Sequence, residues 1–330
     1  MKSNFGFETT VHLYKYMESP RELFTDGFIR ASQLSVLNDP FEALYCKKGL
    51  NELSNHFDNP KIFDNGKKIS FSSYIEKYKE RIGVISLTED KSSHLMWAHY
   101  ANNHHGICVG FNLLDGSING NWIFERLFKE DQHRYSTCWE GYELFNGKPQ
   151  PIKYRRCPRY QIDKFDYDYS NIDAEGADRI LVEVFLQKSD EWLYEKEHRI
   201  VLRLEQADRA LIFDLDRITN SSLKMEIVNA EWTFFNKERN CYEINLLEIL
   251  CGEDRFSIAS ALAGLSKNKK NVYLFKLSSS AIAQCYFGVK NEQLTIDDVK
   301  TPYVTRYGYF DLWKAQRDER SYSIKFDEII

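Results

Sequence analysis

The sequence predicts an α+β fold with mixed, mostly antiparallel sheets and peripheral helices. Three observations favour this class. Short alternating or apolar segments of strand length recur along the chain, segments of helical character separate them, and aromatic residues make up 15% of the 330 residues, against 16 Gly and 7 Pro. We expect one elaborated domain over residues 1–330, with an insertion at 206–270.

The N-terminal elements follow from alternation and turn chemistry. Residues 11–17 alternate as a strand, and Ser19 and Pro20 then supply a cap and a first-turn proline for a short helix. Another apolar segment begins at Phe28. In the sequence Asn38-Asp-Pro-Phe-Glu42, proline biases the residue before it away from helix, which predicts a structured turn.

A strand-helix-strand unit is predicted next. Residues 83–88 form an apolar strand, and Ser93 is an N-cap for a helix from about residue 94 to 103. Gly106 is expected to end this helix in the left-handed conformation. Residues 107–111 then predict a buried strand, in which Cys108 is a small core side chain.

The remaining elements are less regular. Residues 47–80 are typical of surface helices, and residues 112–178 give no placeable element. The segments with strand or core periodicity are 178–185, 192–204, 273–277 and 281–289, the last two expected to pair and to close at Gly288. The tail predicts a peripheral strand and helix.

Charge and hydropathy exclude several classes of protein. The 44 basic and 49 acidic residues give a net charge of -5, so no global field attracts the chain to nucleic acid or anionic lipid. The N-terminus lacks the apolar region of a signal peptide, and no apolar run approaches the roughly 18 residues that cross a bilayer. We expect a cytoplasmic protein without a membrane partner.

No metal site is expected. The seven cysteines include no C-x-x-C pair, which speaks against a thiolate zinc site and a disulfide framework. His94, His99, His104 and His105 lack the spacing of a helical zinc motif with its acid.

The most informative segment is Trp192-Leu-Tyr-Glu-Lys-Glu-His-Arg199. If it is a strand, Glu195, Glu197 and Arg199 lie on one face. Two neighbouring carboxylates repel, and the pKa of one tends to rise, which suits a site that handles a proton and a developing cation. The alternative is a solvated strand face neutralised by the adjacent basic residues.

Three segments together resemble the motifs of ADP-ribosyltransferases. Residues 13–16, 86–88 and 195–197 follow the order of the Arg, Ser-x-Ser/Thr and Glu-x-Glu motifs. The resemblance implies a split-sheet core. Two departures are present, because Lys15 stands where the pattern has Arg and the gap from Ser86 to Glu195 is long.

A second resemblance covers more of the chain. Its blocks are Asn38-Asp-Pro-Phe-Glu42, Ser86-Leu-Thr-Glu-Asp90, Met96-Trp-Ala-His-Tyr100 leading to Gly106-Ile-Cys-Val-Gly-Phe111, and Trp192 to Arg199. They resemble a bacterial family named as domain of unknown function 2971. That family name implies no activity, but the family is similar to components of bacterial toxin and phage-defence loci.

The transferase resemblance implies a role for each motif residue. Cleavage of the ribose–nicotinamide bond of NAD passes through an oxocarbenium-like transition state, which a fixed carboxylate stabilises. We assign this role to Glu197 and that of general base to Glu195. Ser86 is expected to orient the ribose or the catalytic acid, with Thr88 on the same strand face, and Lys15 to neutralise the phosphates of NAD.

Further residues are candidates for binding NAD or a second substrate. Tyr14 and Arg199 flank the motif residues. Trp97 and Tyr100 lie three apart on the predicted helix, so they share a face and are expected to stack on nicotinamide or adenine; alternatively, Trp97 seats the helix on the sheet. The residues expected in a substrate loop are Asn38, Asp39, Glu42 and His99, although the first three also suit a helix cap.

The leading hypothesis is an NAD-dependent ADP-ribosyltransferase or related NAD-cleaving enzyme, acting as a toxin or anti-phage effector. NAD is then a substrate, the acceptor is protein, nucleic acid or water, and an antitoxin or defence-system protein is an expected partner. A second hypothesis is a metal-dependent nuclease with Glu183, Asp190 or Glu195 as ligands. A third is a non-catalytic module that senses a nucleotide or phage component.

Overall fold

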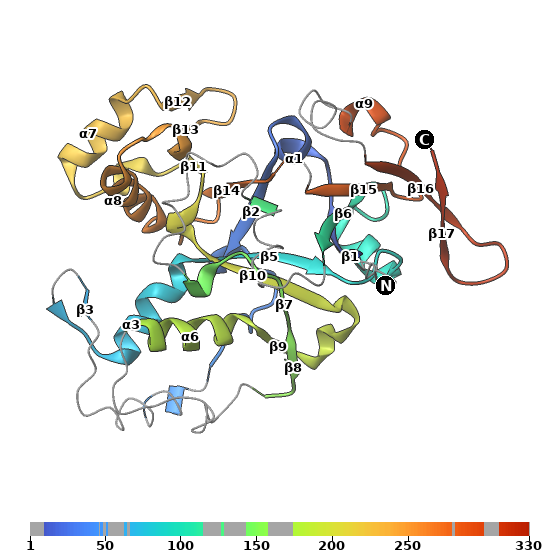
Figure 1. Cartoon of the computed structure of the whole chain (residues 1–330), viewed down its shortest axis with the longest axis horizontal. Helices are drawn as coiled ribbons and strands as arrows, with labels where there is room; N and C mark the ends of the chain where they lie inside the picture. The colour runs from blue at the N-terminus through green and yellow to red at the C-terminus, as the bar shows by residue number, and fades with distance from the viewer. Residues whose placement is uncertain are drawn as a thin grey trace, which may run out of the picture.

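The computed structural model describes residues 10–45, 47–48, 51, 63–64, 67–114, 127–128, 143–157, 174–278, 281–299 and 310–329. Within these residues, thirteen strands form one open sheet, in the order β12-β13-β11-β14-β2-β5-β1-β6-β15-β16-β17, with β10 on β5 and β7 on β10 (Figure 1). The described pairings of this sheet are antiparallel except for β15 with β16. The predicted α+β class with mostly antiparallel strands is therefore confirmed.

The strands of this sheet are β1 (Thr10–Met17), β2 (Phe28–Gln33), β5 (Ile82–Thr88), β6 (Ile107–Leu114), β7 (Gln150–Pro151), β10 (Glu197–Arg203), β11 (Arg209–Ile212), β12 (Thr233–Asn236), β13 (Cys241–Asn245), β14 (Val272–Lys276), β15 (Ile282–Phe287), β16 (Asp311–Arg317) and β17 (Ile324–Glu328). Two separate strand pairs are β3 (Phe63–Asp64) with β4 (Lys67–Lys68), and β8 (Lys153–Arg155) with β9 (Gln187–Ser189). The α-helices are α1 (Arg21–Thr25), α3 (Phe71–Tyr78), α4 (His94–Tyr100), α6 (Ala174–Phe185), α7 (Ser221–Asn229), α8 (Gly252–Ala263) and α9 (Ile296–Val299).

The sheet divides into two branches at the middle of β5. One edge of β5 pairs with β10 along its whole length. On the other edge, Val84 pairs with Ser32 of β2 and Thr88 pairs with Tyr14 of β1. Ser86 lies between them and pairs with no described residue on this edge, although it pairs with Arg199 of β10 on the first edge. We call this point the fork. One branch continues from β2 to β12, and the other from β1 to β17.

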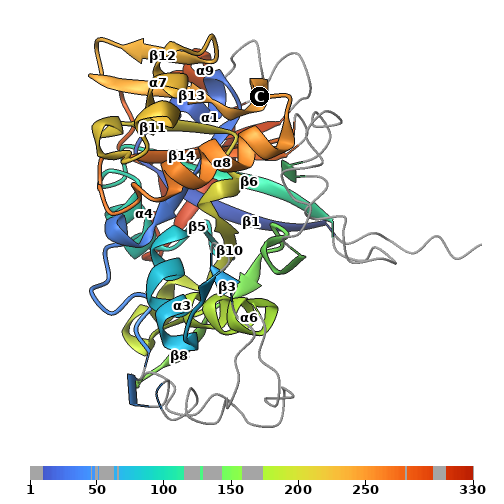
Figure 2. The same ribbon diagram turned by 90° about the vertical axis from the view of Figure 1, so that its left-hand side faces the viewer.

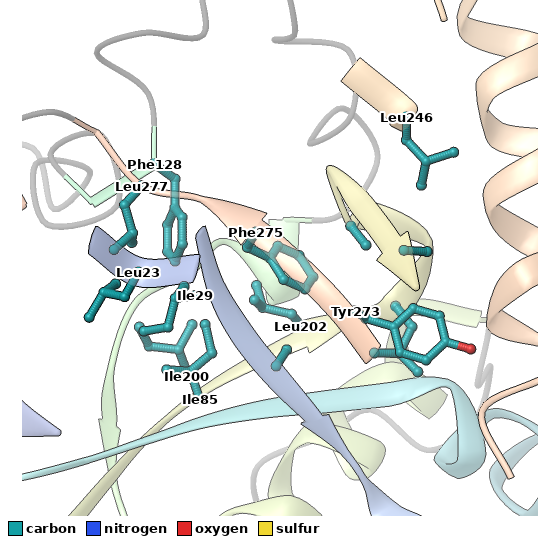
Figure 3. Close-up of a cluster of buried hydrophobic side chains, with 14 of the residues drawn as sticks. Leu23, Ile29, Ile85, Phe128, Ile200, Leu202, Leu246, Tyr273, Phe275 and Leu277 are labelled. Carbon is teal, nitrogen blue, oxygen red and sulfur yellow. The ribbon is translucent and has the colours of Figure 1, made fainter. Parts of the chain in front are cut away.

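Alternation along β5 and β10 gives the two faces of the sheet different cores. Ile85 and Ile200 face a large cluster that includes Ile29, Leu202 and Phe275 (Figure 3). The other face packs on α3 and α6, which lie together on one side of the molecule, while α7, α8 and β11 to β13 lie at the opposite end (Figure 2). The segment 206–270 thus extends the β2 branch through β14.

Most predicted N-terminal elements are confirmed. The strands β1, β5 and β6 are present, Ser93 caps α4 by accepting from the backbone N–H of Met96, and Cys108 is buried in the core. The predicted strand pair at 273–277 and 281–289 is wrong, because β14 pairs with β2 while β15 pairs with β6. The fork directs these two strands into different branches.

Gly106 has a different role from the predicted one. The left-handed positions after α4 are Asn102, Asn103 and His104, whereas Gly106 has no positive φ. A Cβ atom at Gly106 would lie 2.2 Å from the carbonyl oxygen of Met17. Glycine is therefore required here for close approach of the chain to β1.

None of the described helices is long and apolar enough to cross a membrane.

Substitution Gly106→Ala should destabilise the protein by about 1–3 kcal/mol, because the new methyl group collides with backbone rather than with a movable side chain. The matched control is Gly252→Ala in the first turn of α8, where a Cβ would meet no atom within 4 Å. That change should be neutral or stabilising, since Ala favours helix over Gly by up to about 1 kcal/mol. Urea unfolding of both variants tests this, and equal stabilities would contradict it.

Candidate functional site

Three acidic and two basic side chains from distant parts of the chain meet beneath the surface beside β5. They are Glu42, Glu195 and Glu197 with Lys188 and Arg199, and each side chain is 1–4% exposed. We call this set the ion-pair network. Charged side chains are buried at such depth when they are paired, because an unpaired buried charge is costly.

Arg199 joins two of the acids. Its two terminal nitrogens lie 2.7 and 2.6 Å from the carboxylate oxygens of Glu42, and its Nε lies 2.6 Å from Oε1 of Glu197. It also donates to the carbonyl of Phe185 at the end of α6. This forked geometry is the one that guanidinium groups favour with carboxylates, so Arg199 fixes the orientation of both glutamates.

Lys188 of β9 lies between Glu195 and Glu197. Its Nζ is 2.6 Å from Oε2 of Glu195 and 3.2 Å from Oε2 of Glu197, and it also lies 4.6 Å from the ring centre of Trp192. Sequence reasoning missed Lys188. It lies in a three-residue strand without a distinctive pattern.

The backbone structure that brings the two carboxylates together differs from the predicted strand. Glu195 ends a 3₁₀ helix (Asp190–Glu195), Lys196 is left-handed with φ of 44°, and β10 begins at Glu197. The prediction of a continuous strand over 192–204 is therefore wrong. The acids meet because both pair with Lys188, and the hydroxyl of Thr88 donates to the carbonyl of Glu195 at 2.6 Å.

The carboxylates border a small cavity at the fork. Its volume is about 90 Å³, and it is lined by Tyr14, Lys15, Tyr16, Ser86, Leu87, Thr88, Met96, Tyr100, Glu195 and Glu197. A larger neighbouring cavity of about 680 Å³ shares Lys15, Tyr16 and Tyr100 with it. The larger cavity is also lined by Met17, Glu18, Ser19, Leu23, Phe28, Ile29, Arg30, Ser32, Leu211, Phe213, Arg239, Val272 and Leu274. The structure thus brings Lys15, Ser86, Glu195 and Glu197 into one space.

The surroundings move the pKa values of the two acids in opposite directions. Burial alone would raise the pKa of Glu197, but Arg199 and Lys188, with hydrogen bonds from Arg199 and Ser86, lower it to about 2. For Glu195, burial raises the pKa, although Lys188 and Tyr100 oppose this effect. Glu197 is thus held as a carboxylate, whereas Glu195 is closer to exchanging a proton.

Lys15 occupies the gap in the sheet. Its Nζ donates to the carbonyl of Ser86 at 3.2 Å, which satisfies a backbone group that faces the fork. Burial lowers the pKa of Lys15 to about 8; the nearby charge of Glu197 opposes this effect and that of Arg30 adds to it. The ammonium group therefore remains largely protonated at neutral pH and faces both cavities.

The α4 residues divide between the cavity and the core. Tyr100 lines both cavities, donates to Oε1 of Glu195 at 2.6 Å and accepts from Asn38. Trp97 is fully buried, its Nε1 donates to the carbonyl of Lys91, and its ring packs edge-on against Tyr16. The prediction that Trp97 stacks on a ligand is therefore wrong, and Trp97 seats α4 on the sheet.

Two other predicted binding residues lie outside the cavities. Arg199 is 1% exposed and holds Glu42 and Glu197, so it positions the acids instead of contacting a ligand. His99 is exposed and packs against Tyr100 and Tyr194.

The predicted substrate loop at residues 38–42 is a strap over the ion-pair network. Oδ1 of Asp39 accepts from the backbone N–H of Phe41, and Glu42 pairs with Arg199. Asn38, Asp39 and Glu42 line neither of the two cavities described above. Their visible role is to fix the strap on the sheet.

The residues proposed as nuclease ligands do not form a metal site in the described structure. Asp190 pairs with Arg156 at the surface, whereas Glu195 is buried beside Lys188. Among the described residues, no group of three or more His, Cys, Asp or Glu side chains is arranged to hold a metal ion.

Comparison with known families confirms one of the two resemblances. Residues 96–200 match the family described as protein of unknown function (DUF2971), a region that contains α4 from Met96 onward, Lys188, Glu195, Glu197 and Arg199. No curated protein and no solved structure matches the chain. The family supplies no activity, and the resemblance to ADP-ribosyltransferases, including their split-sheet core, stays a prediction.

Substitution Arg199→Met should destabilise the protein by about 3–5 kcal/mol, because it leaves Glu42 and Glu197 as buried carboxylates without their main partner. The control is Arg217→Met, which removes a 73% exposed arginine lying 3.6 Å from Asp214 and should cost about 0–1 kcal/mol. Urea unfolding at neutral pH measures both. A loss for Arg199→Met as small as that of the control would show that the network does not stabilise the fold.

Proposed function

We propose that this protein cleaves the ribose–nicotinamide bond of NAD and transfers ADP-ribose to an acceptor or to water. One observation supports this proposal above the others. Lys15, Ser86 and the pair Glu195 and Glu197 come from three separate segments of the chain, yet all four residues line one cavity at the fork. They are the residues that the transferase motif order implies.

Glu197 has the properties of a group that stabilises a developing cation. Its pKa of about 2 keeps it ionised at neutral pH, and Arg199, Lys188 and Ser86 hold it in place before any substrate binds. A pre-oriented carboxylate beside a ribose carbon that turns positive lowers the barrier without reorganising during the reaction. We therefore assign Glu197 to the oxocarbenium-like transition state.

Glu195 suits proton transfer better than Glu197 does. Burial raises its pKa, and Tyr100 and Lys188 each bond one of its oxygens. A carboxylate of raised pKa is a stronger base than an ordinary one. In the proposed reaction Glu195 accepts the proton of the attacking acceptor or water.

The two adjoining cavities fit the two unequal ends of a dinucleotide. The small cavity has room for a small group beside the acids, while the volume of about 680 Å³ lies within the usual range for ligand pockets. Lys15, Arg30 and Arg239 supply positive charge for phosphates, and Phe28 and Phe213 supply apolar surface for a base. We infer that the nicotinamide end of NAD approaches the acids in the small cavity and that the rest of the dinucleotide occupies the larger one.

The biological setting follows from the same proposal. A protein that consumes NAD or modifies an acceptor acts where NAD is present, in the cytoplasm, and harms its host unless it is held in check. We propose a toxin or anti-phage effector restrained by an antitoxin or defence-system partner. The acceptor is protein, nucleic acid or water.

A second candidate function is a nucleotide-binding module without catalysis. The observation that favours it is the pairing of both carboxylates with Lys188, and of Glu197 also with Arg199, because such pairing also serves a purely structural role. NAD binding that survives replacement of both Glu195 and Glu197 by Gln, with no turnover in the wild type, would favour this candidate.

Substitution Glu197→Gln should lower the rate of nicotinamide release from NAD by at least about 100-fold, because the fixed negative charge is lost at nearly constant volume. The control is Glu205→Gln, which also neutralises a buried carboxylate but one paired with Arg81 away from the cavity. Release is measured by chromatography on purified proteins, with circular dichroism to confirm folding. Equal rates in the wild type and Glu197→Gln would refute the assignment.

A further inference from the structure

A third cavity lies apart from the two at the fork. Its volume is about 230 Å³, and it is lined by Phe41, Leu44, Arg155, Arg156, Cys157, Gln187, Lys188 and Ser189. The strap and the two-stranded sheet of β8 and β9 form its walls. It shares no lining residue with either cavity at the fork.

Positive charge is concentrated on one wall. Arg155 and Arg156 follow each other at the end of β8, and both are exposed. Arg156 lies 3.2 Å from Asp190, whereas Arg155 has no ion pair with any described residue. Adjacent guanidinium groups favour a phosphate, which they bind through forked hydrogen bonds.

The part of the cavity lining that the strap supplies is apolar and held in place. Phe41 of the strap is 62% exposed and Leu44, two residues after the strap, is 46% exposed, so this part of the chain presents two large apolar side chains to solvent. The neighbouring Glu42 is anchored by Arg199, which limits the movement of this wall. An exposed aromatic ring beside arginines provides a stacking surface for a nucleobase.

Gln187 adds an unused hydrogen-bond acceptor. Its Nε2 donates to the carbonyl of Glu183 at 3.1 Å, while its buried Oε1 accepts no hydrogen bond from a described residue. A buried acceptor without a partner is costly, so an amino group that reached it after a small side-chain shift would be favoured. The amino groups of nucleobases are donors of this kind.

We propose that this third cavity binds a nucleoside monophosphate, with its phosphate on Arg155 and Arg156 and its base against Phe41. The volume suits one nucleotide rather than a dinucleotide. The site does not rest on the proposed cleavage of NAD, because the groups assigned to bind the nucleotide, Arg155, Arg156 and Phe41, line neither cavity at the fork.

The experiment titrates purified full-length protein with AMP by calorimetry. We expect binding that weakens at least tenfold in Arg155→Gln and in Phe41→Ala, and that is unchanged in Arg217→Gln, which removes another exposed guanidinium elsewhere. Binding should also be unchanged in Lys15→Met, which alters the cavities at the fork and contacts no residue that lines the third cavity. Inorganic phosphate and an acidic peptide should bind at least tenfold more weakly than AMP.

Four results would overturn the proposal. They are no AMP binding at millimolar concentration, loss of binding in Lys15→Met but not in Arg155→Gln, phosphate binding as tight as that of AMP, and tighter binding of the acidic peptide. The second result would place AMP at the fork. None of them depends on whether NAD is cleaved, so this site and the proposed enzyme can fail separately.

Discussion

The pairing of Arg199 and Lys188 with three buried glutamates is the interaction on which the site depends. Removing charges from water costs several kcal/mol per ion, and only well-oriented ion pairs and hydrogen bonds offset that cost. Here the guanidinium bonds two carboxylates at 2.6–2.7 Å, and the ammonium bridges Glu195 and Glu197. The network also ties together the strap, β9 and β10, so the two acids to which we assign catalytic roles are held by the same contacts that stabilise the fold.

The fork in the sheet creates the cavities that border the ion-pair network. Because β1 and β2 each take one end of the same edge of β5, the backbone at Ser86 is left facing a gap. Lys15 reaches into the gap and lines both cavities. A continuous sheet would have closed this space with backbone hydrogen bonds. The branching of the sheet therefore explains why polar side chains from three segments face one small volume.

Part of this arrangement follows from sequence and part does not. Alternation predicted β1, an apolar run predicted β5, and motif order placed Lys15, Ser86 and Glu197 together. Helical spacing predicted that Trp97 and Tyr100 share a face of α4. Spacing does not predict how deeply each side chain on that face is buried, and Trp97 lies in the core.

Two features of the site depended on contacts distant in sequence or on local backbone geometry. Lys188 lies on a short strand whose pairing with β8 no local pattern reveals. The 3₁₀ turn before Glu197 resembled a strand because its residues also alternate, and the left-handed Lys196 that ends the turn has no sequence marker such as glycine.

The most direct test of this account is a pH titration of the glutamate carboxyl carbons by NMR on ¹³C-labelled protein, with Glu195 and Glu197 assigned by their Gln variants. The account predicts that the Glu197 signal titrates near pH 2 and that the Glu195 signal titrates above the ordinary glutamate range. Two signals that both titrate in the ordinary range would contradict it, because the network would then not distinguish the acids.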